Sequence, residues 1–144
     1  RNMFGGGPGP WNEDRPWKGW WGNDPPYHTP VFVLTHHPRA SLEMEGGTTF
    51  TFVTDGIGSA LEQAKQAAGE LDVLLGGGAN VVQQYLAAGL VDEFELHVVP
   101  IVLGDGERLL DNVGSHRLEQ VRAIEAPGVT HIKYRVSSRG PLEG

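Results

Sequence analysis

Residues 71–86 read Leu71-Asp72-Val73-Leu74-Leu75-Gly76-Gly77-Gly78-Ala79-Asn80-Val81-Val82-Gln83-Gln84-Tyr85-Leu86, a short apolar run that meets three glycines and then becomes helical in spacing. The run 71–75 is mostly Leu and Val, which is typical of a strand buried on both faces in a parallel sheet. From Asn80 onward the apolar residues recur at helical spacing, and Gly89 is a natural stop. The stretch therefore predicts a strand, a glycine turn and a helix.

The glycine turn is also a candidate phosphate site. Glycines let the backbone turn sharply and leave no side chain in the way of a ligand. The first turn of the following helix offers unpaired N–H groups and the positive end of its dipole. The alternative is a tight strand-to-helix joint without a ligand, and the glycines alone leave both interpretations open. The third glycine of the Rossmann fingerprint is missing at its spacing.

Composition narrows the class of protein and its partners. The 144 residues, 39% hydrophobic and 20% charged, predict one ordinary globular domain. A net charge of −7 without a basic block argues against nucleic acid or anionic membrane as a partner. No apolar stretch approaches the roughly 20 residues of a membrane span. The chain has no cysteine, which excludes thiolate chemistry and suits a reducing compartment, so we expect a cytoplasmic location.

The order of elements predicts an α/β fold. Residues 1–30 are rich in Gly, Pro and Trp, which favours an ordered, irregular loop. Strands are predicted at 31–34, 49–54, 71–75 and 94–103. A helix that ends at residue 68 is predicted to begin directly after Asp55, which could cap it, or one turn later at a Ser59–Glu62 capping box. A second helix is predicted from 80 to 88. Short joints between these elements predict a mixed, mainly parallel central sheet with flanking helices.

The end of the chain predicts a different kind of pairing. Residues 118–125 and 130–136 flank Pro127-Gly128, which indicates a C-terminal antiparallel hairpin. We predict a single domain over 1–136 and a tail over 137–144. The sequence starts at Arg1 in what reads as the middle of an element, so we expect an N-terminal strand of the sheet to be missing from it.

Several motifs, taken in order, resemble a known family. They are Arg1-Asn2-Met3-Phe4-Gly5, Val33-Leu34-Thr35-His36, Leu75-Gly76-Gly77-Gly78-Ala79, Leu90-Val91-Asp92-Glu93 and Pro100-Ile101-Val102-Leu103-Gly104-Asp105-Gly106. In combination they resemble the dihydrofolate-reductase-like proteins, specifically the branch related to the C-terminal reductase domain of the bacterial riboflavin-biosynthesis deaminase–reductase. The resemblance covers nearly all of residues 1–136.

This resemblance implies a homodimeric, NADPH-dependent reductase that transfers a hydride to a flat heterocycle of the pterin or pyrimidine kind. It implies that Arg1 helps to hold the cofactor phosphates and that the turn at Thr35-His36 faces the 2′-phosphate. The glycine turn would lie against the pyrophosphate and nicotinamide. The cofactor-binding residues implied are Arg1, Asn2, Thr35, His36, Gly76, Gly77, Gly78, Ala79 and Asn80. A catalytic residue is not assigned.

Two alternatives accompany this expectation. The first is a pyrimidine reductase of riboflavin biosynthesis, which keeps the cofactor and changes the substrate. The second is a non-catalytic nucleotide-binding dimer with the same fold. Met3 stands where the family commonly has Thr, and the family's substrate-site acid would lie upstream of Arg1, which keeps the second alternative open.

Aromatic and histidine side chains are the remaining candidates. Trp20, Trp21 and Tyr27 are candidate walls for a flat substrate, with core packing as the alternative. His36 and His37 leave a strand in opposite directions, so no metal site is predicted there. His97 and His131 are expected on a sheet face without a role in the chemistry.

Overall fold

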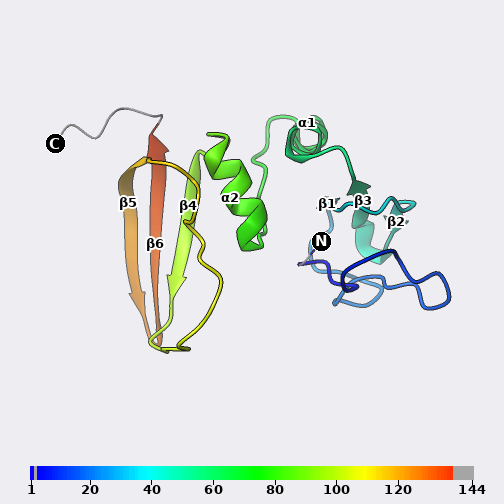
Figure 1. The fold of residues 1–144 in the computed structure, drawn as a ribbon, viewed down its shortest axis with the longest axis horizontal. Helices are drawn as coiled ribbons and strands as arrows, with labels where there is room; N and C mark the ends of the chain where they lie inside the picture. Colours follow the sequence, from blue (N-terminus) through cyan, green and yellow to red (C-terminus); the bar gives the residue numbers. More distant parts are fainter. Residues whose placement is uncertain (2, 138–144) are drawn as a thin grey trace. The chain divides into compact units, whose positions relative to one another are not determined.

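The computed structural model describes residues 1 and 3–137 (Figure 1). Its two helices and two small sheets confirm the α/β class. The chain divides into two compact units, Arg1–Gly78 and a second that begins at Ala79, and each is described by itself. Whether 1–136 is a single domain stays a prediction. Neither helix in the described part of the chain has the length and apolar character needed to cross a membrane.

The first unit contains a three-stranded sheet in the order β1-β3-β2, made of β1 (Pro30–Leu34), β2 (Leu42–Glu43) and β3 (Thr49–Val53). β1 and β3 confirm the strands predicted at 31–34 and 49–54; they pair in parallel, and β2 pairs antiparallel with β3. A short 3-10 turn, η1 (Glu45–Gly47), separates β2 from β3. The sheet therefore ends, at Leu34 and Val53, with two parallel strand ends side by side.

Helix α1 (Ile57–Ala68) lies against β1 and buries Ala60. The predicted end of the helix is confirmed, and its start, which the sequence left open, lies at Ile57; neither predicted cap is used. Gly56 is the N-cap residue, and no side chain caps the helix. At the other end the Gly69 N–H donates to the Lys65 carbonyl at 3.0 Å, so glycine ends the helix as expected.

Aromatic side chains from the irregular N-terminal loop make the core of the first unit. Phe4 is buried with Val33 and Phe50, and its ring centroid lies 5.0 Å from that of Phe50. The loop is ordered, as predicted, because a backbone carbonyl of the loop accepts a hydrogen bond from the indole of one of its own tryptophans. Trp17 Nε1 donates to the Phe4 carbonyl at 2.8 Å. Gly5 needs to be glycine there, since its φ is +86° and a Cβ would lie 2.7 Å from Trp20 Nε1.

The second unit contains α2 (Ala79–Ala87), β4 (Glu93–Val98), β5 (Arg117–Ala126) and β6 (Val129–Ser137). The strand order is β4-β6-β5, and both pairs are antiparallel (Figure 1). The predicted helix and C-terminal hairpin are thus confirmed. Pro127 and Gly128 make its turn, and Gly128 supplies a φ of +78°. Ser137 still belongs to β6, and the rest of the predicted tail, 138–144, lies outside the described residues.

The prediction of a strand at 71–75 is wrong. These residues form no regular structure, and their side chains are exposed, Leu71 at 78% and Leu74 at 92%. Apolar composition indicates that a segment can fit a half-buried pleated surface. A strand also needs a neighbouring strand to pair with, and composition does not show whether one is present. β1 and β3 pair with each other and with β2, so in this structure no ladder of hydrogen bonds includes 71–75.

The predicted strand 94–103 is too long, and the predicted parallel sheet is not formed. β4 ends at Val98, two residues before Pro100, which has no N–H to give to a ladder. β4 also pairs antiparallel with β6, so among the described strands the parallel pair is β1 with β3. Two three-stranded sheets therefore stand in place of one mainly parallel sheet.

Candidate functional site

The end of β1 positions the first predicted site residues. Thr35 follows Leu34, is buried, and donates its N–H to the Val53 carbonyl at 3.0 Å, which ties the turn to the end of β3. The Thr35 hydroxyl accepts the His37 N–H at 3.2 Å, the usual closure of a turn by a hydroxyl. His36, between them, is exposed. The turn is therefore rigid at its base and presents His36 to solvent.

Arg1 lies against this turn. Its main-chain nitrogen donates to the Leu34 carbonyl at 2.7 Å, and its guanidinium carbon lies 3.8 Å from the centroid of the Trp11 ring. The guanidinium donates to the Gly6 carbonyl at 3.0 Å and to the Gly9 carbonyl. Its Nε is buried without a hydrogen-bond partner in the described part of the chain.

A second guanidinium shares the same ring. The Arg39 guanidinium carbon lies 4.9 Å from the Trp11 centroid, and Arg39 also donates to the Trp17 carbonyl. Burial first, and then the charge of Arg1, lower the pKa of Arg39. Trp11 itself is fixed because Nε1 donates to the His37 carbonyl at 2.8 Å. We call Arg1, Trp11 and Arg39 the arginine–tryptophan cluster.

The cluster carries positive charge that the described residues do not neutralise. Within residues 1 and 3–137, neither Arg1 nor Arg39 lies within ion-pair distance of a carboxylate. A planar guanidinium with free N–H groups matches the geometry of carboxylate and phosphate oxygens. The arrangement can therefore accept an anion at the end of β1.

Part of the glycine turn lies near this cluster. A Cβ on Gly77 would lie 3.9 Å from Met3 Cγ, so Gly77 packs beside the loop that begins with Arg1. Gly77 has a φ of +103°, which suits glycine, and its peptide bond to Gly78 is cis. A Cβ on Gly76 would meet nothing within 4 Å, so this backbone is open to approach.

Three other predicted cofactor-binding residues, Asn2, Ala79 and Asn80, are not among the described residues of the first unit. Ala79 and Asn80 begin α2 and belong to the second unit, where Asn80 Oδ1 accepts a hydrogen bond from Gln84 Nε2 at 2.7 Å. Asn2 lies outside the described residues. Their part in cofactor binding stays a prediction.

The aromatic residues predicted for the substrate pack in pairs within the first unit. The Trp17 and Trp20 centroids are 4.6 Å apart, and those of Trp21 and Tyr27 are 5.0 Å apart, both edge to face. Trp20 remains 66% exposed. The open hollows of the second unit, beside Val99 and beside His116, contain none of the predicted site residues. A substrate role for Trp20, Trp21 and Tyr27 stays a prediction.

Sequence reasoning left Trp11 and Arg39 out of the predicted cofactor site. Trp11 was one of several loop tryptophans, and its contact with Arg39 joins residues far apart in the chain. The available signal was Arg39 itself, which follows the end of β1 within the same turn as Thr35 and His36.

Solved structures place this fold in a class. The chain is similar to a protein of Shewanella sp. PV-4 named for a proposed part in riboflavin biosynthesis, with a TM-score of 0.63 and 20% identity over 82% of this chain and 66% of that one. It is also similar to a pyrimidine reductase-like protein of Corynebacterium diphtheriae, with a TM-score of 0.53 and 18% identity over 75% of this chain and 50% of that one. These likenesses support a dihydrofolate-reductase-like fold.

The sequence identifies the family. The profile of the RibD C-terminal domain matches residues 3–132, and the chain belongs to this reductase family. The resemblance seen in the motifs is thereby confirmed. The chain is also 39% identical over 94 residues to uncharacterized protein YyaP of Bacillus subtilis (strain 168), covering 62% of this chain. It spans about half the length of that relative.

Proposed function

We propose that this protein is an NADPH-dependent reductase that transfers a hydride to a flat heterocycle of the pterin or pyrimidine class. The observation that carries the proposal is the arginine–tryptophan cluster, in which two guanidinium groups share the Trp11 ring. Like charges this close repel each other, and this repulsion adds to burial, the larger cause, in lowering the pKa of Arg39. A bound phosphate would relieve that repulsion, and the 2′-phosphate is what distinguishes NADPH from NADH.

The residues present fit such a cofactor. Arg1 Nε is a buried donor without a partner in the described residues, and such donors are costly unless an acceptor reaches them. Arg39 and the exposed His36 belong to the same turn after β1, and both side chains carry nitrogen donors. In the proposal these residues hold the 2′-phosphate, and Gly76 to Gly78, with Ala79, Asn80 and Asn2, hold the remaining phosphates.

When bound, the cofactor supplies the hydride, and the protein supplies orientation and exclusion of water. We place the substrate beside Trp20, Trp21 and Tyr27, whose flat faces suit a heterocycle. Of the candidate substrates, the pyrimidine of riboflavin biosynthesis is favoured by the family match and by the name of the Corynebacterium diphtheriae relative.

A homodimer remains part of the proposal. Residues 98–103 expose several large apolar side chains, with Val102 at 97%, and contiguous exposed apolar surface is typical of interaction sites. A second copy of the chain is the occupant we propose for this surface. Analytical ultracentrifugation of the wild type and of Val102→Glu tests it: a dimer that the substitution dissociates supports the proposal, and a monomeric wild type contradicts it.

Cofactor titration tests the central proposal. Fluorescence titration of the purified protein is expected to show saturable binding of NADPH and weaker binding of NADH. Arg39→Gln should weaken NADPH binding by about tenfold or more, because a hydrogen bond to a charged group contributes about 1.5–3 kcal/mol. The same substitution should leave NADH binding nearly unchanged. Arg15→Gln is the matched control, since Arg15 is an exposed arginine of the same loop outside the cluster.

The outcomes separate the alternatives. Failure of the wild type to bind either nucleotide would end the cofactor proposal. Equal loss of NADPH and NADH affinity in Arg39→Gln would contradict the role of Arg39 at the 2′-phosphate. Turnover with dihydrofolate or with the ribosylaminopyrimidine of riboflavin biosynthesis identifies the substrate class. Saturable binding without oxidation of NADPH by either substrate supports the non-catalytic nucleotide-binding alternative.

A further inference from the structure

One face of the second unit brings together three side chains that are common metal ligands. In the β4–β6 pair, His97 lies opposite His131 and Glu95 lies opposite Lys133. Side chains two residues apart on a strand point to the same face, so Glu95 and His97 share a face. Directly opposite residues of an antiparallel pair have neighbouring Cβ atoms, which places His131 against His97. The regular register of two strands, not a loop, therefore fixes the group.

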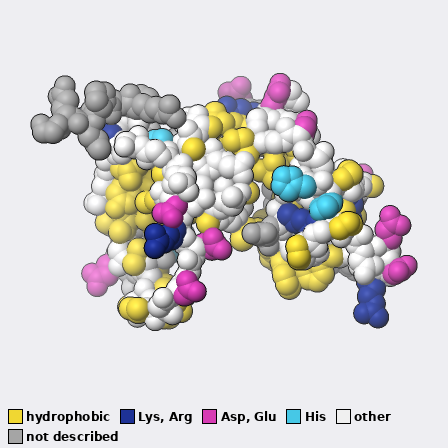
Figure 2. Space-filling model, viewed as in Figure 1, with side chains coloured by type: hydrophobic (Ala, Val, Ile, Leu, Met, Phe, Trp, Pro, Cys, Tyr) yellow, Lys and Arg dark blue, Asp and Glu magenta, His cyan; other side chains and the backbone are white. Residues whose placement is uncertain are grey.

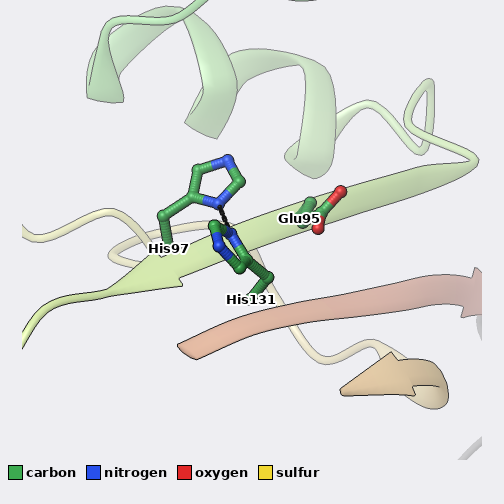
Figure 3. A group of neighbouring side chains, drawn as sticks. All are labelled: Glu95, His97 and His131. Atoms are coloured by element: carbon green, nitrogen blue, oxygen red, sulfur yellow. Dashed lines mark hydrogen bonds between the residues drawn. The ribbon is translucent and has the colours of Figure 1, made fainter. Parts of the chain in front are cut away.

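The side chains converge closely. The Nδ1 atoms of His97 and His131 are 2.6 Å apart, and one ligand atom from each of Glu95, His97 and His131 lies within 4.8 Å of the others. Figure 3 shows the two imidazole rings joined by this hydrogen bond, with the Glu95 carboxylate beside them. His97 is exposed to solvent, so an ion can reach the group without rearrangement of the strands.

We propose that Glu95, His97 and His131 form a binding site for a divalent transition-metal ion, with Zn²⁺ as the reference ion. Imidazole nitrogens suit zinc, nickel and copper, whereas magnesium and calcium prefer all-oxygen sites. Two imidazoles and one carboxylate leave a coordination position for water, as in open zinc sites. From the sequence, His97 and His131 were expected to have no role in the chemistry, and a metal site would revise that expectation.

Because the two imidazoles are hydrogen-bonded to each other, a metal ion can bind only after the shared proton leaves the space between them. One Nδ1 carries the shared proton and the other accepts it. Moving that proton to Nε2 of the same ring leaves both rings neutral and frees both Nδ1 lone pairs for the ion. A small rotation of the rings then opens the space between them. The backbone of β4 and β6 does not have to move.

Glu95 already has a partner that competes with an ion. Arg122 Nη2 lies 3.0 Å and 3.1 Å from the two Glu95 oxygens, and the Glu95 side chain is 28% exposed. The other nearby cation, Lys133, is bonded to Glu93 at 2.6 Å. Arg122→Gln should therefore tighten metal binding, because it removes the competitor and the repulsive charge while leaving all three ligands. A merely structural role for the histidines predicts no such gain.

Calorimetric titration of the metal-free full chain with ZnCl₂ tests the proposal. The wild type is expected to bind one ion, MgCl₂ is expected to give no heat of binding, and the melting temperature of the protein should rise with added Zn²⁺. His97→Ala and His131→Ala should each weaken binding by more than about tenfold, since even outer partners of a metal site contribute that much. Glu95→Gln should weaken it less, and Arg122→Gln should strengthen it.

His116→Gln is the matched control, because His116 belongs to the same unit and is bonded to the Val113 carbonyl instead of the cluster. It should bind Zn²⁺ as the wild type does. Far-UV circular dichroism establishes that each variant is folded, and the imidazole resonances of His97 and His131 report binding in the wild type without any substitution. Absence of Zn²⁺ binding by the wild type, or unchanged binding by both His97→Ala and His131→Ala, would overturn the proposal. Neither result bears on NADPH binding.

Discussion

The two units of the chain differ in the partners of their cationic side chains. On the face of the β4-β6-β5 sheet that carries Glu95, Arg122, Lys133 and Arg135 each have a carboxylate partner. The pairs are Arg122–Glu95, Lys133–Glu93, Arg135–Glu93 and Arg135–Glu119. In the first unit, Arg1 and Arg39 lie on the Trp11 ring and donate to backbone carbonyls. Figure 2 shows one view of how charged and apolar side chains are distributed over the surface.

This difference distinguishes charge that stabilises a sheet from charge that is available to a ligand. Exposed ion pairs contribute about 0–1 kcal/mol each and largely cancel one another's field. Guanidinium groups held against an aromatic ring keep their charge and lose hydration, so an anion gains more by approaching them. The arrangement of partners, not the number of arginines, is the reason why we propose the anion site in the first unit.

The largest expected effect comes from removing the scaffold of the arginine–tryptophan cluster. Phe4 is buried and its ring contacts those of Trp11, Phe50 and Phe52. Phe4→Ala should cost about 3–5 kcal/mol of unfolding free energy in the first unit. All four tryptophans lie in this unit, so intrinsic fluorescence during urea unfolding reports on it specifically.

The matched substitution in the second unit is Phe94→Ala. Phe94 is half-buried on β4 with its ring 5.5 Å from that of Tyr134, so the loss there should be only about 1–2 kcal/mol. Tryptophan fluorescence that shifts equally in both variants would contradict the distinction between an aromatic core in the first unit and a half-buried sheet in the second.

A smaller effect is expected where the loop backbone meets Trp20. Gly5→Ala combines a φ of +86° with a contact of 2.7 Å to Trp20 Nε1, and should cost roughly 2–4 kcal/mol. Gly7→Ala is the control, since Gly7 has a φ of +70° and open space around its Cβ position, and it should cost about 1 kcal/mol. Thermal unfolding of both variants measures the difference. Equal losses would show that Trp20 does not pack against Gly5.

The smallest expected effect concerns the paired charges of the second unit. The hydrogen bond from Lys133, and then its charge and that of Arg135, hold the pKa of Glu93 below its ordinary value of 4.5. A carboxylate with a lowered pKa stabilises the fold above pH 4.5 and loses that contribution as the pH falls through its folded-state pKa.

Glu93→Gln should therefore be less stable than the wild type near neutral pH, by a small amount because the pair is exposed. The difference should shrink as the pH falls below 4.5. Chemical unfolding at several pH values, followed by circular dichroism, measures both. A difference that is independent of pH would contradict the proposed ion pair.

Local patterns predicted the elements that depend on local chemistry. The apolar period of α1, the helical spacing of α2 and the Pro127-Gly128 turn of the β5–β6 hairpin all depend on neighbouring residues. These elements were predicted closely, except for the start of α1, which the sequence left open. The segment 71–75 failed because a strand depends on a partner elsewhere in the chain. The overlong strand at 94–103 is different, because Pro100 was visible in the sequence and its missing N–H predicts the end of β4.

In the candidate sites too, residues in local motifs were predicted, and contacts that depend on tertiary packing were missed. Arg1, Thr35 and Gly77 were predicted from motifs, and the first unit holds Arg1 against the β1 end and Gly77 beside Met3. Arg39 and Trp11 were missed because their contact is a matter of tertiary packing. The histidine pair needed the register of β4 and β6, since alternation alone predicts the face of each histidine but not its neighbour.

The most direct test of the anion site is an NMR titration that follows the Trp11 indole N–H and the Arg39 Nε–H. The Trp11 indole donates to the His37 carbonyl at the base of the cluster, so its resonance reports on the turn after β1. We predict that NADPH shifts both resonances in a saturable way and that NADH shifts them much less. Saturable binding of NADPH that leaves both resonances unmoved, or that shifts them no more than NADH does, would contradict a 2′-phosphate site at Arg1, Trp11 and Arg39.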